Sequence, residues 1–105
     1  MTEFEQGRAQ ASVGVVDGAL VLRLTGELDL STIADAKRIA DNVIGQHPDR
    51  LVVDLSEVTF MDSTGIALLI WIANSLPQVE IRNPSPRVTE LFDLTGLTGT
   101  FPVVT

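Results

Sequence analysis

Residues 51–55 read Leu51-Val52-Val53-Asp54-Leu55, a nearly continuous apolar run. Extended back to Arg50, this run predicts a central strand that is buried on both faces, as strands of parallel sheets are. The following residues, Ser56 to Met61, are expected to form a loop. This loop would bring the chain to the tetrapeptide Asp62-Ser63-Thr64-Gly65.

A second apolar run, Ile66 to Ala73, follows the tetrapeptide and predicts a helix over about residues 63–75 that ends at Pro77. The first peptide N–H groups of a helix have no internal partner and carry partial positive charge. A serine hydroxyl there can cap the helix, bind an anion or carry a phosphate. The local pattern leaves two simpler roles open, in which Asp62 or Ser63 is only a cap and Gly65 serves only close packing.

The first part of the chain predicts an antiparallel hairpin. Two β-rich runs, Ala11–Val16 and Ala19–Leu24, flank the dipeptide Asp17-Gly18, which is a strong signal for a tight turn. Residues 1–8 are polar and are expected to fray or to extend an edge strand.

A helix is expected after Gly26-Glu27-Leu28-Asp29-Leu30. Apolar residues recur at helical spacing from Ile33 to Ile44. Thr32 and Asp35 resemble a capping pair, in which the side chain of one residue reaches the backbone of the other. Gly45 and Pro48 should end this helix.

The C-terminal part predicts a short strand, Val79–Arg82, and a third helix that begins at Ser85-Pro86 and ends near Gly96. Residues 101–104 can add a last strand, and Pro102 would place it at an edge. The alternation of strands and helices predicts an α/β fold: a mixed sheet with an N-terminal antiparallel hairpin, parallel central strands and helices packed on the sheet.

Composition narrows the possible functions. The chain has 105 residues, which predicts a single domain over residues 1–105, and its formal net charge is −7. Nucleic acid and anionic membranes require a basic surface, so neither is an expected partner. There is no cysteine, which excludes disulfides and thiol chemistry. No signal peptide or membrane span is recognisable, and we expect a soluble, cytoplasmic protein.

Acidic and hydroxyl side chains gather in the strand-to-helix loops. Asp29, Asp62 and Ser63 follow predicted strands, and such loops meet at one edge of a parallel sheet. Asp54 lies within the neighbouring strand. Asp29 and Asp62 could form a general acid–base pair, or Asp29 could be a simple turn residue.

Sequence patterns typical of enzymes are missing. The nucleophile pattern Gly-x-Ser-x-Gly and a Walker-type phosphate loop are absent, and no His, Asp and Glu residues stand at metal-ligand spacing. The single histidine, His47, is expected to be a solvated loop residue. We therefore expect neither enzymatic activity nor a metal or cofactor.

One face of the second helix carries an apolar strip that begins at Ser63. Spacing of three and four residues places on that face Ser63, Ala67, Ile70, Trp71 and Asn74. The core face would be formed by Ile66, Leu69, Ile72 or Ala73, and Leu76. Trp71 is either ordinary core or the anchor of a protein-docking strip.

Four segments together resemble one family. They are Gly26-Glu27-Leu28-Asp29, the run of residues 51–55, Met61-Asp62-Ser63-Thr64-Gly65, and Asn83-Pro84-Ser85-Pro86-Arg87-Val88 followed by Leu94-Thr95-Gly96-Leu97. Over roughly residues 10–104 the chain resembles a STAS domain of the anti-sigma factor antagonist family.

The resemblance implies that Ser63 is phosphorylated, with Thr64 as a second candidate acceptor. It implies an anti-sigma factor with serine kinase activity as the partner, which the unphosphorylated protein binds so that a sigma factor is freed, and a phosphatase that resets the site. The expected partner-binding residues are Asp29, Asp62, Ser63, Thr64, Gly65, Ala67 and Trp71. The alternative is a STAS subunit of a larger signalling scaffold or lipid-transport complex.

Overall fold

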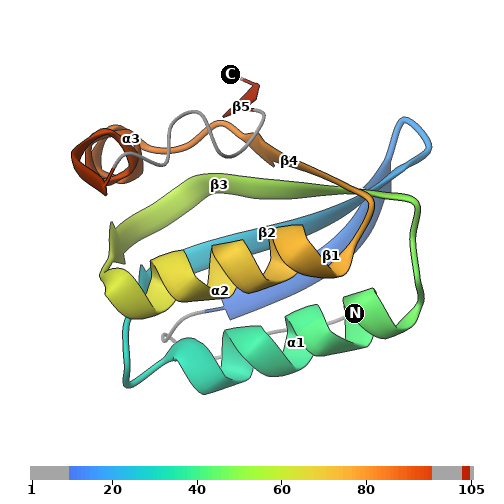
Figure 1. The fold of residues 1–105 in the computed structure, drawn as a ribbon, viewed down its shortest axis with the longest axis horizontal. Coiled ribbons are helices and arrows are strands. Elements are labelled where there is room, and N and C mark those ends of the chain that lie inside the picture. The colour runs from blue at the N-terminus through green and yellow to red at the C-terminus, as the bar shows by residue number, and fades with distance from the viewer. Residues whose placement is uncertain (1–9, 96–102, 105) are drawn as a thin grey trace.

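The protein is a five-stranded mixed sheet with helices packed on it (Figure 1). The computed structural model describes residues 10–95 and 103–104. The elements are β1 (Gln10–Val16), β2 (Ala19–Leu28), α1 (Ile33–Gly45), β3 (Arg50–Met61), α2 (Ser63–Ser75), β4 (Gln78–Arg82), α3 (Pro86–Thr95) and β5 (Val103–Val104).

The strand order is β1-β2-β3-β4-β5, with β1 antiparallel to β2 and all other neighbours parallel. This confirms the predicted fold class, and β5 lies at the edge where a last strand was expected. Residues 1–8, Gly96 and Pro102 lie outside the described residues. None of the helices in the described part of the chain is long and apolar enough to cross a membrane.

The hairpin between β1 and β2 forms at the predicted dipeptide. Asp17 and Gly18 have φ angles of 52° and 81°, and Val16 pairs with Ala19 across the turn. Two consecutive positive φ angles define the turn type whose twist matches that of two antiparallel strands.

The core lies between the sheet and the helices. Helices α1 and α2 lie side by side on one face of the sheet (Figure 1). The core combines alternate residues of the central strands with residues from all three helices, among them Leu22, Leu24, Leu51, Val53, Leu55, Ala40, Leu69, Ile72, Val88 and Phe92. Val52 and Asp54 on the opposite face of β3 are also buried, so residues 51–55 are buried on both faces as predicted.

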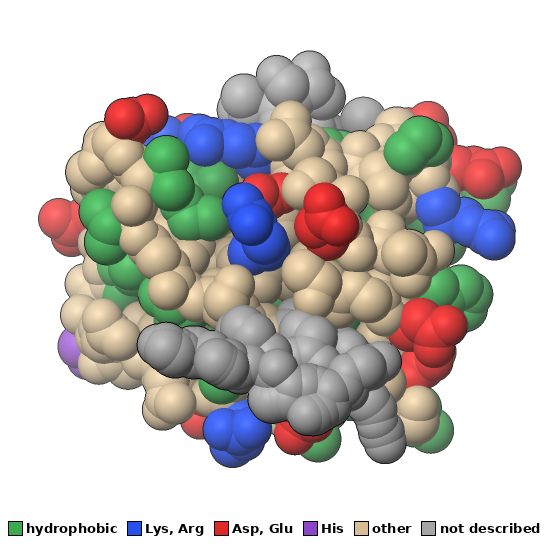
Figure 2. Space-filling view, turned by 180° about the vertical axis from the view of Figure 1, so that it is seen from behind, with side chains coloured by type: hydrophobic (Ala, Val, Ile, Leu, Met, Phe, Trp, Pro, Cys, Tyr) green, Lys and Arg blue, Asp and Glu red, His purple; other side chains and the backbone are tan. Residues whose placement is uncertain are grey.

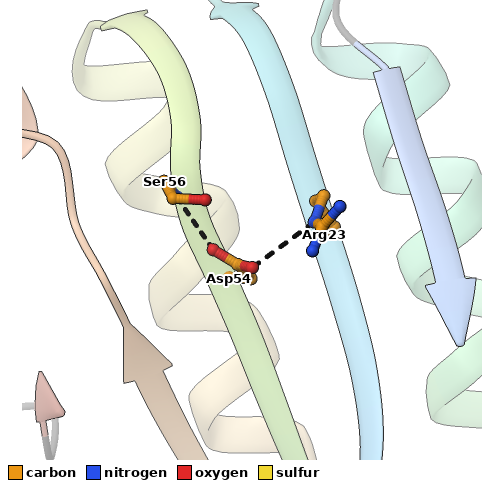
Figure 3. Close-up of polar contacts among 3 residues, drawn as sticks. All are labelled: Arg23, Asp54 and Ser56. Carbon is orange, nitrogen blue, oxygen red and sulfur yellow. Dashed lines mark hydrogen bonds and ion pairs between the residues drawn. The ribbon is translucent and has the colours of Figure 1, made fainter. Parts of the chain in front are cut away.

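β3 is longer than predicted, because Ser56–Met61 continues the strand instead of forming a loop. These residues stay paired with β2 through two register shifts, and the last pair is Leu28 with Met61. The Asp54 carboxylate accepts a hydrogen bond from the Ser56 N–H (2.9 Å) and forms an ion pair with Arg23 (3.3 Å) (Figure 3). The Asp54 side chain thus bonds the backbone two residues further along β3, which accommodates the register shift at this point of the strand.

Helix α1 ends as predicted after Gly45, but a different residue makes the turn. The His47 N–H donates to the Ile44 carbonyl (2.9 Å), and His47 has a φ angle of 54° in an exposed position. The left-handed conformation at His47 therefore ends the helix, and the side chain lies in the exposed loop that was expected. At the other end of the described chain, Ser85 caps α3 as predicted, since its hydroxyl accepts from the Val88 N–H (3.4 Å).

Gly65 fills a position where α2 comes very close to the sheet. A Cβ atom at Gly65 would lie 2.5 Å from Met61 Cγ, 3.0 Å from the Leu28 carbonyl oxygen and 3.1 Å from Leu28 Cβ. The methionine side chain can move aside, but the backbone carbonyl cannot. The close packing that the sequence left open for Gly65 is thus present in the structure.

We expect Gly65→Ala to lower the free energy of unfolding by about 1–3 kcal/mol, because the added methyl group overpacks this contact. Urea unfolding, followed by circular dichroism, measures the change. Gly45→Ala is the matched control, since a Cβ there meets nothing within 4 Å and alanine is the better helix former. An equal loss of stability in both variants would contradict the packing explanation.

Candidate functional site

The loops after β2 and β3 adjoin at the carboxyl edge of the sheet. Leu28 and Met61 are the last paired residues of the two strands, and the Asp62 N–H donates to the Leu28 carbonyl (3.3 Å). Asp29 and Asp62 directly follow this last pair. The structure therefore brings together the two loops that the sequence placed at one edge.

Asp62 caps helix α2. Its Oδ1 atom accepts hydrogen bonds from the Thr64 N–H (2.8 Å) and, at longer range, from the Gly65 N–H (3.4 Å). Its backbone is extended, as is typical of a residue that precedes a helix. The sequence left the cap open between Asp62 and Ser63, and the structure assigns it to Asp62.

Ser63 is thereby left free of the capping role. It is the first residue of α2 and is exposed, and its hydroxyl makes no hydrogen bond to any of the described residues. Thr64 is half-buried, and Gly65 is buried, which places Gly65 behind this surface rather than on it. Ser63 therefore presents the most accessible hydroxyl of the tetrapeptide.

Asp29 closes a small hydrogen-bonded turn. Its Oδ1 atom accepts from the Ser31 N–H (3.0 Å) and from the Ser31 hydroxyl (2.8 Å). The pKa of Asp29 lies below its ordinary value, mainly because the Ser31 hydroxyl donates a hydrogen bond to the carboxylate. Hydrogen bonds from the backbone of Ser31 and from Thr32 act in the same direction. Asp29 is thus the turn residue that the sequence allowed.

Thr32 holds the same loop from inside. Its buried hydroxyl donates to the Glu27 carbonyl (2.6 Å) and accepts from the Asp29 N–H (3.1 Å). The predicted capping pair between Thr32 and Asp35 is wrong, because the Thr32 side chain makes no capping bond to α1. The hydroxyl instead bonds residues that precede the helix.

These bonds weigh against an acid–base pair of Asp29 and Asp62. The Asp29 carboxylate accepts a hydrogen bond from the Ser31 N–H, which favours its charged form, and the Asp62 carboxylate is engaged in capping α2. A general acid needs a pKa raised toward neutrality, whereas that of Asp29 is lowered. Within residues 10–95 and 103–104, no three His, Cys, Asp or Glu side chains could hold a metal ion.

Two apolar residues at this edge were missed by sequence reasoning. Leu30, in the loop after β2, is 79% exposed, and Phe60, near the end of β3, is 40% exposed. Phe60 pairs with Glu27 of β2. Glu27 lies two residues before Asp29, where the loop after β2 begins. The signal that could have identified Leu30 was an apolar residue in an otherwise polar loop. Phe60 gave no such signal, because it lies in the segment that was expected to be a loop.

The strip on α2 is only partly free. Ser63, Ala67 and Asn74 are exposed, and Ile70 and Trp71 are half-buried against the core. The expected core face is buried at Ile66, Leu69, Ile72 and Leu76, and Leu68 joins it. Lys37 of α1 places its ammonium group 4.3 Å from the centre of the Trp71 ring, a favourable cation–π contact. Trp71 therefore takes part in the packing of α1 against α2, and the free part of the strip lies at Ser63, Ala67 and Asn74.

We expect Asp62→Ala to lower the free energy of unfolding by about 1 kcal/mol, because two N–H groups of α2 lose their acceptor. Asp62→Asn is the matched control, since its amide oxygen can still accept these bonds, and it should lose at most a few tenths of that amount. Urea unfolding measures both. A smaller loss in Asp62→Ala than in Asp62→Asn would contradict the assignment of the cap.

Known proteins resemble this chain in sequence. The anti-sigma-F factor antagonist RsfB of Mycobacterium tuberculosis is 36% identical over 62 residues, which cover 59% of this chain and 51% of RsfB. The match thus spans about half of that relative. The anti-sigma-B factor antagonist of Staphylococcus epidermidis is 31% identical over 80 residues, which cover 72% of this chain and 74% of the relative.

Solved structures share the fold. An anti-sigma factor antagonist from Mycobacterium paratuberculosis superposes with a TM-score of 0.86 at 28% identity, covering 95% of this chain and 88% of that one. The phosphorylated form of the Bacillus cell fate determinant SpoIIAA superposes with a TM-score of 0.66 at 25% identity, covering 90% and 91%. The family model of the STAS domain matches residues 10–105. The chain therefore belongs to the STAS domain family.

Proposed function

We propose that this protein is an anti-sigma factor antagonist that is switched by phosphorylation of Ser63. The observation that carries the proposal is the division of roles at α2, where Asp62 makes the capping bonds and the Ser63 hydroxyl is exposed. The names of the relatives support it, as does the likeness to the phosphorylated form of SpoIIAA. The partner is an anti-sigma factor with serine kinase activity, and a phosphatase restores the free hydroxyl.

The switch is electrostatic in this proposal. A phosphate on Ser63 adds a charge of about −1.5 to −2. The two N–H groups that could best hold it, those of Thr64 and Gly65, already bond the Asp62 carboxylate. The new charge therefore lies beside an existing negative charge and points toward solvent, where a docked partner would meet it.

Binding of the unphosphorylated protein would use the apolar groups at this edge. Leu30, in the loop after β2, and Ala67, on α2, are exposed. Apolar side chains that lose contact with water in an interface supply affinity, while unpaired charge at the same place costs several kcal/mol. One added phosphate can thus release the partner without any change of fold.

We expect Ser63→Ala to bind the anti-sigma factor whether or not ATP is present, and Ser63→Glu to bind at least about tenfold more weakly, which corresponds to about 1.4 kcal/mol. Isothermal titration calorimetry measures the affinities. Intact-mass analysis after incubation with the kinase and ATP should show one added phosphate on the wild type and none on Ser63→Ala.

Thr64→Ala is the matched control, because its backbone N–H still donates to Asp62. It should be phosphorylated and released like the wild type. Phosphate on Thr64 alone would contradict the site. A pull-down that recovers a transport ATPase in place of a kinase-like anti-sigma factor would contradict the proposed function itself.

We expect Leu30→Ser to weaken binding to the anti-sigma factor about tenfold with little change in the thermal midpoint, because this exposed side chain contributes to docking and not to the core. Leu94→Ser is the matched control, since Leu94 is also 79% exposed but lies on α3. Equal binding by both variants would exclude Leu30 from the interface.

A further inference from the structure

Strand β3 uses two more residues than β2 to cover the same length of the sheet. β2 has 10 residues and β3 has 12. The two strands are nevertheless level at both ends, since Leu20 pairs with Leu51 and Leu28 pairs with Met61. Two register shifts take up the extra residues. A residue without a partner on the neighbouring strand forms a β-bulge, which bends the strand and increases its twist.

The apolar pattern of the two strands shows that the core does not require the extra residues. The core side chains of β3 lie two residues apart at first and three residues apart later: Leu51, Val53, Leu55, Val58 and Met61. The residues of β2 on the same face keep a constant spacing of two: Leu20, Leu22, Leu24, Gly26 and Leu28. A β3 without Ser56 and Thr59, which are both exposed, would alternate regularly and place the same five side chains in the core.

The two irregular steps are supported by residues that a regular strand would not need. At the first shift, the buried Asp54 carboxylate accepts from the Ser56 N–H (2.9 Å) and pairs with Arg23 (3.3 Å) (Figure 3). Burying a carboxylate costs free energy unless it is paired and hydrogen-bonded, as it is here. At the second shift, Gly26 has a φ angle of 81°, which side chains other than glycine disfavour.

Both shifts lie in the half of β3 that leads to the proposed switch. From Leu20 to Arg23 the pairing with β3 is regular, and the shifts fall between Arg23 and Glu27. The pairing of β3 with β4, over Arg50–Asp54, is regular as well. β-Bulges are common beside functional sites, where they redirect a side chain. The position of these two bulges therefore points to the loop before α2.

We propose that the two bulges of β3 direct the start of α2 toward the loop after β2, and that Asp54 is thereby a positioning residue for Ser63. The second shift is followed at once by the last pair, Leu28 with Met61, and then by Asp62, whose N–H donates to the Leu28 carbonyl (3.3 Å). The bend of β3 thus sets how the two loops meet. Asp54 acts on Ser63 through the strand. The part of the inference that concerns the switch rests on the proposed function.

A second ion pair offers a comparison for the Asp54 contact. Figure 2 shows the sheet from the side opposite α1 and α2, where basic and acidic side chains lie next to each other near the middle of the face. Arg50 of β3 pairs with Glu80 of β4 at 2.8 Å, and Glu80 is level with Val52 in the regular part of the strand. The two contacts therefore separate the effect of losing an ion pair from the effect of loosening a bulge.

Deletion of Ser56 tests the first bulge. The core side chains should keep their places, so the urea midpoint should change little, but the Asp62 N–H should lose its fixed position at the Leu28 carbonyl. Hydrogen exchange, followed by NMR, should become at least about tenfold faster at the Asp62 N–H and stay unchanged at residues 51–53. The affinity for the anti-sigma factor, from calorimetry, should fall at least about tenfold. A folded deletion variant with the wild-type value of either quantity would overturn the proposal.

Substitutions test the same bulge without shortening the chain. Asp54→Ala should speed exchange at the Asp62 N–H and weaken binding about two- to tenfold, as expected for the loss of one hydrogen bond. Asp54→Asn should restore most of both, because its amide oxygen can still accept from the Ser56 N–H. Glu80→Ala is the matched control and should leave both unchanged. Equal effects of Asp54→Ala and Glu80→Ala would overturn the positioning role.

The two readouts separate this inference from the proposed function. A wild-type protein that binds no anti-sigma factor would contradict the proposed function. The exchange rate of the Asp62 N–H needs no partner, and it would still decide whether the bulges position the start of α2. Faster exchange in the Ser56 deletion with unchanged binding of the anti-sigma factor would overturn the role assigned to Asp54 in the switch.

Discussion

The hydrogen bonds of the Asp62 carboxylate to the start of α2 organise the carboxyl edge of the sheet. The backbone N–H of the same residue bonds the Leu28 carbonyl, which ties the loop before α2 to the end of β2. One residue thus fixes where the helix begins and how close it lies to the neighbouring strand. The close approach at Gly65 follows from that placement, and so does the exposed position of Ser63.

The other loop at this edge is held by a different device. Thr32 is buried, and its hydroxyl bonds the backbone of Glu27 and Asp29, while Asp29 bonds Ser31. Both loops therefore have their backbone shape set by local side-chain bonds. A surface that is ordered in this way before a partner arrives loses less conformational entropy on binding. The exposed Leu30 is carried on such a loop.

The sequence predicted those parts of the fold that depend on short patterns. The Asp17-Gly18 turn, the buried run of residues 51–55 and the apolar helix α2 each carry their signal within a few residues. The continuation of β3 through Ser56–Met61 was not predictable in this way. Its pairing passes through register shifts against β2, which remove the alternation of apolar and polar residues that marks a strand.

The candidate site shows the same limit. The tetrapeptide at Asp62 was recognisable, because a helix start has a local signature. The sequence could not decide whether Asp62 or Ser63 is the cap, since both residue types can serve. The prediction that Thr32 caps the first helix was wrong for a related reason. The spacing of Thr32 to Asp35 fits a capping box, but the buried hydroxyl bonds the nearby backbone of residues that precede the helix. Phe60 was missed because it lies in the part of β3 that was expected to be a loop.

The same geometry bears on how an acidic protein can use a phosphate as a switch. The total charge of −7 is a poor measure of the effect, because charges farther than about 8 Å are largely screened at physiological salt. The charge that counts is the Asp62 carboxylate, next to Ser63 in the chain and already placed on the helix N–H groups. Since the favourable position for an anion is occupied, the phosphate proposed at Ser63 would have less compensation from its own helix. More of its charge would then be felt by a partner docked at this edge.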